Sequence, residues 1–325
     1  MIISKTPFRI SFFGGGSDYP DWYLENGGRV LSTTINKYLY ISLKELPKFF
    51  PHSYRISYSR IECVNKISEI KHVAVREVLK RYLNKNKCEI NCISDLPARS
   101  GIGSSSTFSV GLLNAVYNFQ GKKISKKNLY KKAIHLERNI LNENVGSQDQ
   151  VAAAVGGLNS IEFNKNGKIH IRKINCKRSR VIEFQNKLLL FYTGKQRKAS
   201  SIAKEHINTI KKKTVNMSYF SDLALEAEKI FLSNKNLDIL GELLHESWEK
   251  KKKISTKISS SKIDEYYHIA KKSGALGGKI LGAGGGGFLL IFCNEKKKNI
   301  IKKNLNFLEN IDFSLETGGS RIINL

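Results

Sequence analysis

Cysteine, proline, methionine and tryptophan are scarce in this sequence of 325 residues. The five cysteines are an odd number and most lie far apart, so the sequence contains no disulfide framework. No apolar run reaches the roughly 18 residues of a membrane-spanning helix. Residues 1–10 carry a lysine and an arginine among short apolar stretches and lack the apolar core of a signal peptide. We therefore expect a soluble, cytoplasmic protein with no membrane partner.

Cys88 and Cys92 form the one close cysteine pair. Residues 88, 90 and 92 alternate, so a strand would place both thiols and Ile90 on one buried face. A zinc site is the alternative, but it needs further ligands, and no His or Cys pair with zinc spacing accompanies these two. The spacing therefore favours a buried strand.

Acidic residues are also few. The chain has 28 of them against 55 lysines and arginines, which gives a formal net charge of +27. Such an excess is typical of nucleic-acid-binding proteins. The lysines, however, are spread along the whole chain, and no basic stripe is interleaved with aromatic residues. We therefore expect no nucleic-acid partner, and nucleic-acid binding stays a distant alternative function.

The chain length favours two domains, which we place at residues 1–180 and 181–325. In the first half, alternating apolar residues predict strands over 2–13, 33–43 and 88–93. Helical periodicity predicts a helix over 104–119 and a second one, capped by Ser125, that continues to Ile140. A short alanine-rich helix is expected over 151–155, followed by strand-like segments up to about residue 180.

The second half is expected to be mainly helical, with helices over 221–232, 237–252 and 259–272. Strands are expected over 187–192, at the end of segment 282–293 and near Arg321. Strands and helices mix without a regular βαβ alternation, which predicts the α+β class.

A glycine- and serine-rich loop runs from Leu96 to Ser106, directly into the helix predicted over 104–119. Glycines let the backbone approach a ligand, and a helix N-terminus offers unpaired N–H groups with a positive partial charge. Hydroxyls add donors or a magnesium ligand. The loop lacks the Gly-Lys-Ser/Thr ending of a Walker A motif. It is interpreted as a phosphate-binding loop of another type, with a flexible Ser/Gly turn as the alternative.

Two more glycine clusters stand at the ends of the chain. The segment Gly282 to Phe288 contains five glycines just before an apolar run. Their entropic cost indicates close approach of another backbone or of a ligand, with a tight hairpin turn as the alternative. Near the N-terminus, Arg9 precedes the bend Gly14-Gly15-Gly16-Ser17-Asp18. Asp18 could accept hydrogen bonds from sugar hydroxyls or could close an Asx turn.

Glu137 and Asp149 are acids in unusual surroundings. Glu137 lies one helical turn from Ala133, beside the apolar stripe of its helix. A buried magnesium ion would stabilise its charge, because hard cations take carboxylate oxygens. Asp149 directly precedes the alanine-rich segment. Each could instead be an ordinary surface acid.

Taken in order, these segments resemble the GHMP kinase superfamily, which includes galactokinase, homoserine kinase, mevalonate kinase and phosphomevalonate kinase. Its three motifs are similar to Pro7-Phe8-Arg9 with the glycine bend, to Pro97 through Ser106, and to Gly282 through Phe288. The resemblance covers nearly the whole chain. It implies an ATP- and Mg²⁺-dependent kinase with a ribosomal-protein-S5-like N-terminal domain and a ferredoxin-like α/β-plait C-terminal domain.

The resemblance also implies roles for single residues. Asp149 would take the proton from the attacking hydroxyl, while Arg9 would keep Asp149 ionised and stabilise the transferring phosphoryl group. Ser105 and Glu137 would bind Mg²⁺. Arg99 is a cation that the family motif lacks. The ATP phosphates would be bound by Arg99, Gly101, Ile102, Gly103, Ser104, Ser105 and Ser106.

Several segments resemble one branch, the D-glycero-alpha-D-manno-heptose 7-phosphate kinases, and also the kinase domain of fucokinases. They are residues 12–20, Thr193-Gly194 with Arg197 and Ala199, residues 245–249, and Gly277-Gly278-Lys279. The bend differs from the Gly-Glu-His-x-Asp of galactokinase, which argues against that enzyme. The branch implies phosphorylation of the anomeric hydroxyl to give the 1,7-bisphosphate, in nucleotide-activated heptose biosynthesis for capsule or lipopolysaccharide.

A substrate that already carries a phosphate needs cations to bind it. Candidates are Lys195, Arg197, Lys251, Lys252 and Lys279, of which Arg197 and Lys279 lie inside motif segments. For each, a solvated surface charge is the alternative. The remaining expected substrate contacts are Gly16, Ser17, Asp18, Gly284 and Gly285. A neutral sugar such as L-fucose is the alternative substrate, and convergence of cations near Asp149 would discriminate. A homodimer stays open.

Overall fold

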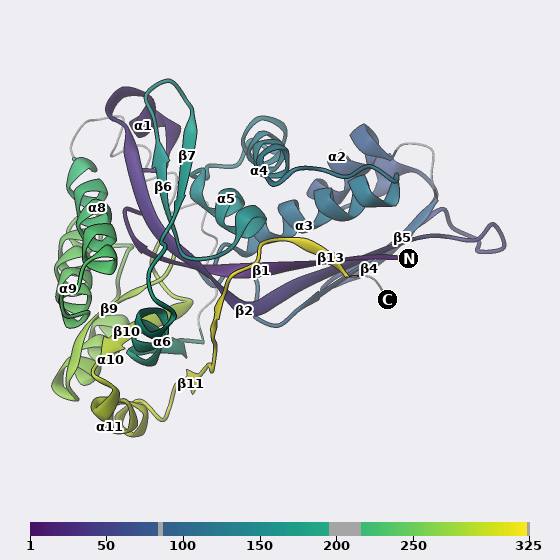
Figure 1. Cartoon of the computed structure of the whole chain (residues 1–325). Helices are drawn as coiled ribbons and strands as arrows, with labels where there is room; N and C mark the ends of the chain where they lie inside the picture. The colour runs from purple at the N-terminus through teal and green to yellow at the C-terminus, as the bar shows by residue number, and fades with distance from the viewer. Residues whose placement is uncertain (84–86, 195–215, 324–325) are drawn as a thin grey trace.

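The computed structural model describes residues 1–83, 87–194 and 216–323, which form two sheets with helices packed against them (Figure 1). Within these ranges the larger sheet has nine strands, and its main path runs β13-β1-β2-β5-β3-β4. Its strands are β1 (Ile2–Phe13), β2 (Gly28–Glu45), β3 (Tyr54–Ser57), β4 (Ile61–Val64), β5 (Cys88–Ser94), β6 (Asn159–Phe163), β7 (Ile169–Lys173), β12 (Leu315–Glu316) and β13 (Arg321–Ile323).

The smaller sheet has four strands among the described residues, in the order β11-β8-β10-β9. They are β8 (Leu188–Tyr192), β9 (Ala275–Ile280), β10 (Phe288–Cys293) and β11 (Glu309–Asn310). Both faces of β10 are covered, since all six of its residues are buried. This explains why its sequence is continuously apolar rather than alternating.

Helices of the first half are α1 (Pro20–Asn26), α2 (Val73–Tyr82), α3 (Ser104–Phe119), α4 (Lys126–His135), α5 (Gln148–Val155) and α6 (Arg178–Asn186). Those of the second half are α8 (Ser218–Leu232), α9 (Asp238–Lys252), α10 (Ser261–Lys272) and α11 (Lys298–Asn304). Short turns are the 3₁₀ helices η1 (Ile67–Glu69) and η3 (Glu295–Lys297) and one π-helical turn, η2 (Leu136–Ile140). The predicted α+β class is confirmed.

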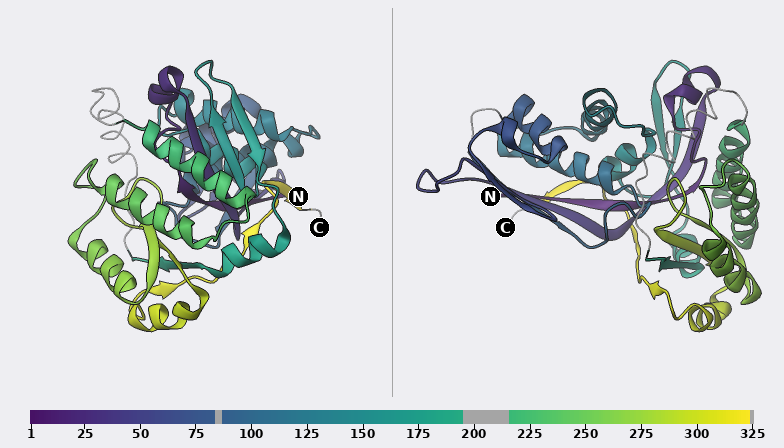
Figure 2. Two further views of the ribbon diagram at one scale, coloured as in Figure 1. Left: turned by 60° about the vertical axis from the view of Figure 1, so that its left-hand side comes forward. Right: turned by 180° about the vertical axis from the view of Figure 1, so that it is seen from behind.

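Helices α2 to α5 lie along one face of the larger sheet, as the views from front and back agree (Figure 2). Helix α3 packs across β1 and β2, burying Val110 and Leu113 completely. Ser125 caps α4 as expected, its hydroxyl accepting from the N–H of Asn128. The loop in front of α3 and the start of α5 therefore meet at one end of this helical layer.

The pairing of β1 with β2 is irregular between Pro7 and Arg9, where the register shifts. Proline has no N–H to give to the ladder, and such irregularities twist a strand and re-aim its side chains. Immediately after the shift, the Arg9 N–H donates to the carbonyl of Ile102 at 3.3 Å. The strand thus joins the loop before α3 at the residue whose guanidinium enters the site.

The last residues of the chain return to the larger sheet. Strand β13 pairs with β1, and the fully buried Ser320 donates its N–H to Ala153 in α5. Its hydroxyl lies 2.8 Å from that of Thr6 and accepts from Asn114 at 3.0 Å. Residues from both ends of the chain therefore support α5. The predicted division at residues 180 and 181 stays a prediction.

Several expected boundaries were wrong. The alanine-rich helix begins at residue 148 instead of 151, so Asp149 lies in its first turn rather than before it. The second helix ends at His135 and gives way to the π turn, where continuous helix was expected. Residues 178–186 form α6, where strand was expected to continue to about 180. Cys88 is fully buried and Cys92 partly buried on β5, as expected from their spacing.

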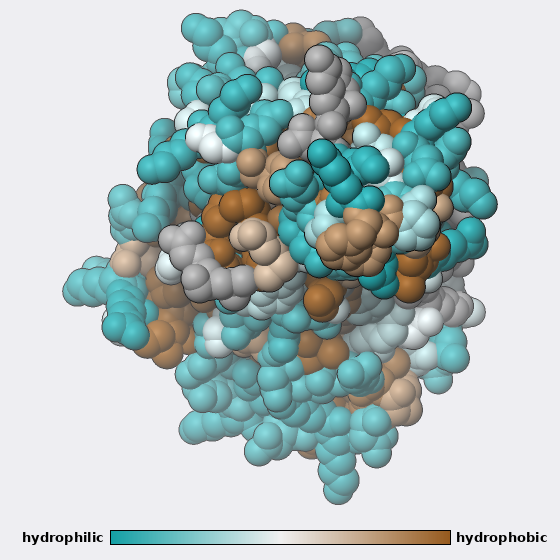
Figure 3. All heavy atoms as spheres, turned by 90° about the vertical axis from the view of Figure 1, so that its right-hand side faces the viewer, coloured by the Kyte–Doolittle hydropathy of each residue, from teal (hydrophilic) through white to brown (hydrophobic). Residues whose placement is uncertain are grey.

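The face at the end of the larger sheet where β4 and β5 lie is mainly hydrophilic, with apolar side chains in separate spots (Figure 3). Exposed apolar residues of the described surface, such as Phe49 and Ile182, are scattered, which is normal for a protein surface. Among the described residues, no helix is both long and apolar enough to cross a membrane.

Candidate active site

The side chains selected from the sequence meet in one cleft. It is lined by β1, the glycine bend after β1, the loop before α3, the start of α5, the end of α9 and the turn after β9. The predicted residues that line it are Arg9, Gly16, Asp18, Arg99, Gly101, Gly103, Ser104, Ser105, Ser106, Asp149 and Lys279. Arg197 and Lys195 lie outside the described residues.

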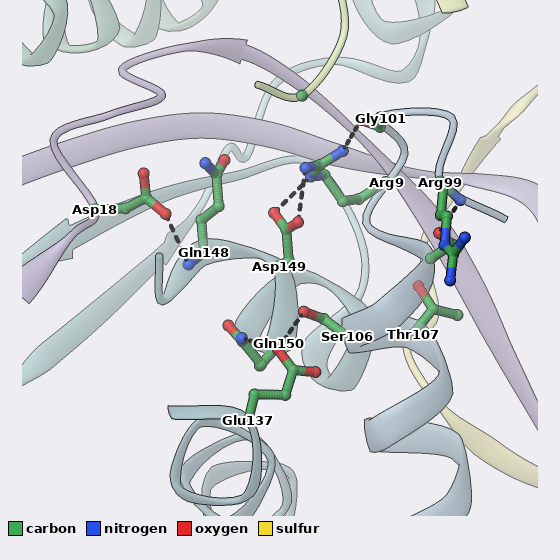
Figure 4. Close-up of polar contacts among 12 residues, drawn as sticks. Arg9, Asp18, Arg99, Gly101, Ser106, Thr107, Glu137, Gln148, Asp149 and Gln150 are labelled. Atoms are coloured by element: carbon green, nitrogen blue, oxygen red, sulfur yellow. Dashed lines mark hydrogen bonds and ion pairs between the residues drawn. The ribbon is translucent and has the colours of Figure 1, made fainter. Parts of the chain in front are cut away.

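Arg9 and Asp149 form a bidentate ion pair in the cleft (Figure 4). Arg9 Nε donates to Asp149 Oδ1 at 2.8 Å, and Nη2 donates to Oδ2 at 2.7 Å. The third nitrogen, Nη1, donates to the carbonyl of Gly101 at 2.7 Å. Bidentate pairing fixes the carboxylate in one orientation. Asp149 is the more exposed partner, its side chain 24% accessible against 4% for Arg9, so it faces the cleft.

The loop before α3 lies directly against the turn after β9. A Cβ on Gly101 would lie 2.3 Å from the carbonyl oxygen of Leu281, and one on Gly287 would lie 2.1 Å from that of Ser100. The Phe288 N–H donates to Ser100 at 3.2 Å. The second glycine cluster thus serves close approach of another backbone, one of the two functions expected of it. Ser104, Ser105 and Ser106 at the start of α3 line the cleft, so the N-terminal N–H groups of the helix are available there for an anion.

Two predicted substrate glycines lie elsewhere. Gly284 packs against Ile258, and the Gly285 N–H donates to the Ile258 carbonyl at 2.8 Å. Neither lines the cleft. Ser17 is fully buried. Its hydroxyl lies within hydrogen-bond distance of the carbonyls of Gly14 and Arg29 and so stabilises the bend on the side away from the cleft. Ile102 packs into the core and also does not line the cleft. Ligand contacts by these four residues stay predictions that this geometry does not favour.

Asp18 lies at the end of the bend and is almost completely buried. Oδ1 accepts from the Gly16 N–H at 3.0 Å, and Oδ2 from the Gln148 N–H at 3.2 Å. Burial, and to a lesser degree the charge of Asp149, raise the pKa of Asp18 above its ordinary value. Asp18 is thus a fixed hydrogen-bonding group beside Asp149, in a place where a sugar hydroxyl could contact it.

Glu137 is fully buried behind the start of α3, in the π turn. Oε2 accepts from Ser106 at 2.8 Å and from Gln150 Nε2 at 2.5 Å, while Oε1 has no partner from the described part of the chain. Burial raises the pKa of Glu137 to about 7. π turns are frequent at functional sites because they displace a side chain from the regular helical face.

The hydroxyl expected beside Glu137 belongs to a different residue. Ser105 Oγ lies 3.4 Å from Glu143 Oε2, whereas Glu137 is contacted by Ser106 and is also stabilised by the side chain of Ser109. No cluster of three or more His, Cys, Asp or Glu side chains suited to a metal occurs in the described ranges. One or two carboxylates are enough for Mg²⁺ when substrate phosphates and water complete its shell. The unpartnered Oε1 atom of Glu137 fits such a ligand.

Lys251 and Lys279 bring positive charge into the cleft from the second half of the chain. Lys251 Nζ donates to the Gly282 carbonyl at 2.9 Å, and Lys279 Nζ donates to the Phe12 carbonyl at 3.0 Å. Both are buried, at 8% and 5% exposure, and within the described residues neither has a carboxylate within ion-pair distance. Burying unpaired charge is costly.

The pKa values of the two lysines reflect this cost. Burial lowers the pKa of Lys251 to about 8, although the charge of Asp18 partly opposes the change. Burial and the charges of Lys251 and Arg9 lower the pKa of Lys279 well below its ordinary value. Lys252, by contrast, pairs with Glu249 at 2.8 Å and Asp264 at 3.4 Å at the surface. The cleft is therefore electrostatically prepared for an anion.

Comparison with known proteins identifies the family of this chain. Residues 68–157 match the model of the GHMP kinases N-terminal domain, and residues 227–310 match that of the GHMP kinases C-terminal domain. The two matches together cover more than half of the chain. It belongs to the GHMP kinase family. As such it is an enzyme, a phosphotransferase, as the sequence motifs implied.

Relatives of this GHMP kinase include a D-glycero-alpha-D-manno-heptose 7-phosphate kinase of Campylobacter jejuni, 29% identical over 97% of both chains. A mevalonate kinase of Methanocaldococcus jannaschii is 28% identical over 84% of this chain and 80% of its own. Among solved structures, a D-glycero-D-manno-heptose 1-phosphate kinase from Bacteroides thetaiotaomicron superimposes with a TM-score of 0.81. It covers 100% of this chain and 99% of its own, at 24% identity, and confirms the fold.

The residues that line the cleft of this GHMP kinase but were not selected from the sequence include Ser11, Gly15 and Gln148. Each is adjacent or close to a selected residue, and none carries a charge. Gly15 belongs to the glycine bend, of which only Gly16, Ser17 and Asp18 were selected as substrate contacts. The signal that could have found Gln148 is its place beside Asp149 at the start of a helix. For Ser11, the signal is its position two residues after Arg9 on the same strand face.

Proposed function

We propose that this GHMP kinase transfers the γ-phosphoryl group of ATP to the anomeric hydroxyl of D-glycero-alpha-D-manno-heptose 7-phosphate. The observation that carries the proposal is the pair of buried lysines, Lys251 and Lys279, in the same cleft as Asp149. The 7-phosphate would supply these two lysines with a counter-charge in addition to the ATP phosphates, whereas a neutral sugar would leave that role to ATP alone. The name of the Campylobacter jejuni relative supports the same substrate.

The acceptor side of the reaction rests on Asp149, Arg9 and Asp18. Asp149 takes the proton from the anomeric hydroxyl as its oxygen forms a bond to the γ-phosphorus. The bond from that phosphorus to the β,γ-bridging oxygen breaks, and ADP leaves. Arg9 holds the Asp149 carboxylate in position through its two hydrogen bonds. Asp18 orients the sugar by accepting a hydrogen bond from a neighbouring hydroxyl.

The donor side rests on the loop before α3. Its backbone N–H groups and the N-terminus of α3 bind the ATP phosphates, with Arg99 at the edge of the cleft. Glu137 would hold Mg²⁺ together with the serine hydroxyls at the start of α3. The ion, when bound, neutralises charge on the phosphates. Positioning and charge neutralisation are the main demands of phosphoryl transfer.

The wider setting is also part of the proposal. The 1,7-bisphosphate would be consumed in the synthesis of nucleotide-activated heptose for surface polysaccharide. The cytoplasmic location, the homodimer and the division into domains 1–180 and 181–325 stay predictions.

The test is ADP release by the purified full-length chain with D-glycero-D-manno-heptose 7-phosphate, run beside L-fucose, galactose and mannose. Turnover with the phosphorylated heptose alone is the expected result. Turnover only with a neutral sugar would retain the kinase mechanism and overturn the substrate assignment.

A further inference from the structure

The three glycines of the bend after β1 differ in whether the backbone conformation or the space for a Cβ atom requires glycine at that position. Gly14 has a φ of 82°, and a Cβ there would lie 1.8 Å from the carbonyl oxygen of Arg29. Gly16 has a φ of 109°, a conformation that only glycine adopts readily. Gly15 has neither constraint. The atoms nearest to an added Cβ are Gln148 Nε2 and Ser11 Oγ, both at 3.7 Å, an ordinary contact distance.

The fold therefore does not require glycine at position 15, but the cleft does gain space from it. Gly15, Ser11 and Gln148 all line that cleft. The Gln148 side chain stands between Asp18 and Asp149 (Figure 4). A side chain larger than hydrogen at position 15 would project toward Ser11 and Gln148 and fill this compartment.

Each of the two polar side chains that line this compartment has an oxygen atom without a hydrogen-bond partner among the described residues. Ser11 is 4% exposed and Gln148 is 9% exposed. Ser11 Oγ and Gln148 Oε1 are buried without a hydrogen-bond partner in the described part of the chain. Such atoms are few in native proteins and call for an explanation. Gln148 Nε2 and Ser11 Oγ are the atoms nearest to the space beside Gly15, and both residues line the cleft next to Asp149. A ligand group bound there could supply the partners that the two side chains lack.

The chemistry of this pair identifies the group. A serine hydroxyl and a glutamine amide are neutral and can each donate and accept, which suits an uncharged hydroxyl. The cations Lys251 and Lys279 suit a phosphate instead. We propose that Gly15 is a specificity-determining residue whose missing side chain keeps open a compartment where Ser11 and Gln148 bind neutral hydroxyls of the acceptor sugar. This inference rests on the proposed function and adds to it the residues that select the sugar.

The experiment measures kcat, the KM values for sugar and ATP, and the melting temperature of Gly15→Ala, with heptose 7-phosphate as acceptor. We expect an unchanged or slightly higher melting temperature, a KM for the sugar raised at least tenfold, and an unchanged KM for ATP. Gly14→Ala is the contrasting variant, which should lower the melting temperature because its Cβ cannot be placed. A Gly15→Ala protein that melts as early as Gly14→Ala would overturn the proposal.

Ser11→Ala and Gln148→Ala give a second, independent measurement. Each should raise the KM for the sugar several-fold with little change in the KM for ATP. Combining either with Gly15→Ala should add less than the single effects predict, because all three act on the same ligand hydroxyls. A sugar KM within twofold of wild type in all three single variants would contradict the compartment.

Failure of this inference can be told from failure of the proposed function. If the wild-type enzyme turns over L-fucose or mannose and not heptose 7-phosphate, the heptose assignment falls. The same variants are then compared on the sugar that is turned over, and a tenfold rise in its KM still supports the compartment. If no sugar of the panel is turned over, both proposals fall together.

Discussion

Glu228 of α8 lies 3.0 Å from the guanidinium of Arg29 in β2, and this ion pair joins a helix of the second half to the strand that holds the glycine bend. Glu228 is 1% exposed and also accepts from Ser160 at 2.6 Å and Arg172 at 2.9 Å. Burial acts to raise its pKa, but these hydrogen bonds and the charge of Arg29 lower it overall. The backbone of Arg29 in turn binds Ser17 of the bend.

Glu228→Gln should therefore destabilise the protein and loosen the bend. Removing the buried carboxylate takes a charge partner from Arg172 and leaves Arg29 paired only with Glu162. We expect a loss of up to about 3 kcal/mol. The matched control is Glu162→Gln, because Glu162 also pairs with Arg29, at 3.2 Å, but is 38% exposed and should cost less than about 1 kcal/mol. Urea unfolding would measure both. Equal losses would contradict this account of the network.

Asp149→Asn should lower kcat by roughly 10²- to 10⁴-fold, the contribution of a general base. Its two hydrogen bonds from Arg9 need a carboxylate geometry that the amide only partly reproduces. ATP affinity, measured by isothermal titration with Mg²⁺, should stay close to wild type because Asp149 acts on the acceptor. A variant that retained most of its turnover would show that another group takes the proton.

Glu137→Gln should weaken metal binding and, at neutral or higher pH, make the metal-free protein more stable. Burial raises the folded pKa of Glu137 to about 7 from the ordinary 4.5. Its contribution to stability is therefore fully present below about pH 4.5 and declines as the pH rises to about 7. Above that pH the metal-free variant should be more stable than wild type, by on the order of 3 kcal/mol, while the Mg²⁺ dependence of its activity weakens.

The comparison variant is Glu143→Gln, since Glu143 is the acid that contacts Ser105. Thermal melts in EDTA from pH 5 to 8, and activity titrated with Mg²⁺, distinguish the two acids. A change in Mg²⁺ dependence confined to Glu143→Gln would assign the metal to Ser105 and Glu143 instead.

Lys251→Met should make the free protein more stable and weaken its binding of the phosphorylated sugar. The folded pKa of Lys251 is about 8, below the ordinary 10.5, because the charged form is buried. The charged lysine therefore destabilises the free protein below about pH 8, and this effect disappears as the pH rises toward 10.5. At pH 7 the variant should gain on the order of 3 kcal/mol, and its KM for the phosphorylated sugar should rise roughly 10- to 100-fold.

The pH profile tests the same charge in the wild-type enzyme. The kcat/KM for the phosphorylated sugar should fall above about pH 8, where free Lys251 loses its proton, and this fall should be absent in Lys251→Met. Lys253→Met is the control, because Lys253 follows on the exposed face of the same helix end. If the control and Lys251→Met gave the same KM, the phosphate would be bound elsewhere.

Local signals in the sequence were enough to predict β1, α3 and β10. Alternation, helical periodicity and a continuous apolar run are local patterns, and they can be recognised in the sequence without knowledge of the fold. The same patterns failed at α6, where five of nine residues have charged or amide side chains and no clear apolar stripe is present. They also failed at the π turn, since the spacing of Leu136 and Ile140 fits a regular helix equally well.

Most features of the site that could not be predicted from the sequence depend on contacts between residues far apart in the chain. The pairing of Arg9 with Asp149 joins residues 140 positions apart and was accessible only through the family resemblance. The burial of Lys251 had one local signal, because it lies three residues after the buried Trp248 on the same helix face. Whether that face met solvent or the cleft depended on the packing of α9 against β9.

The buried Ser320 makes the packing of α5 depend on a segment that is distant in the sequence. Ser320 contacts Thr6, 314 positions away, and donates its N–H to Ala153 in α5. Contacts between such distant residues are slow to form during folding. The helix that carries Asp149 should therefore reach its native packing late in refolding, after the segment around Ser320 has docked on the larger sheet.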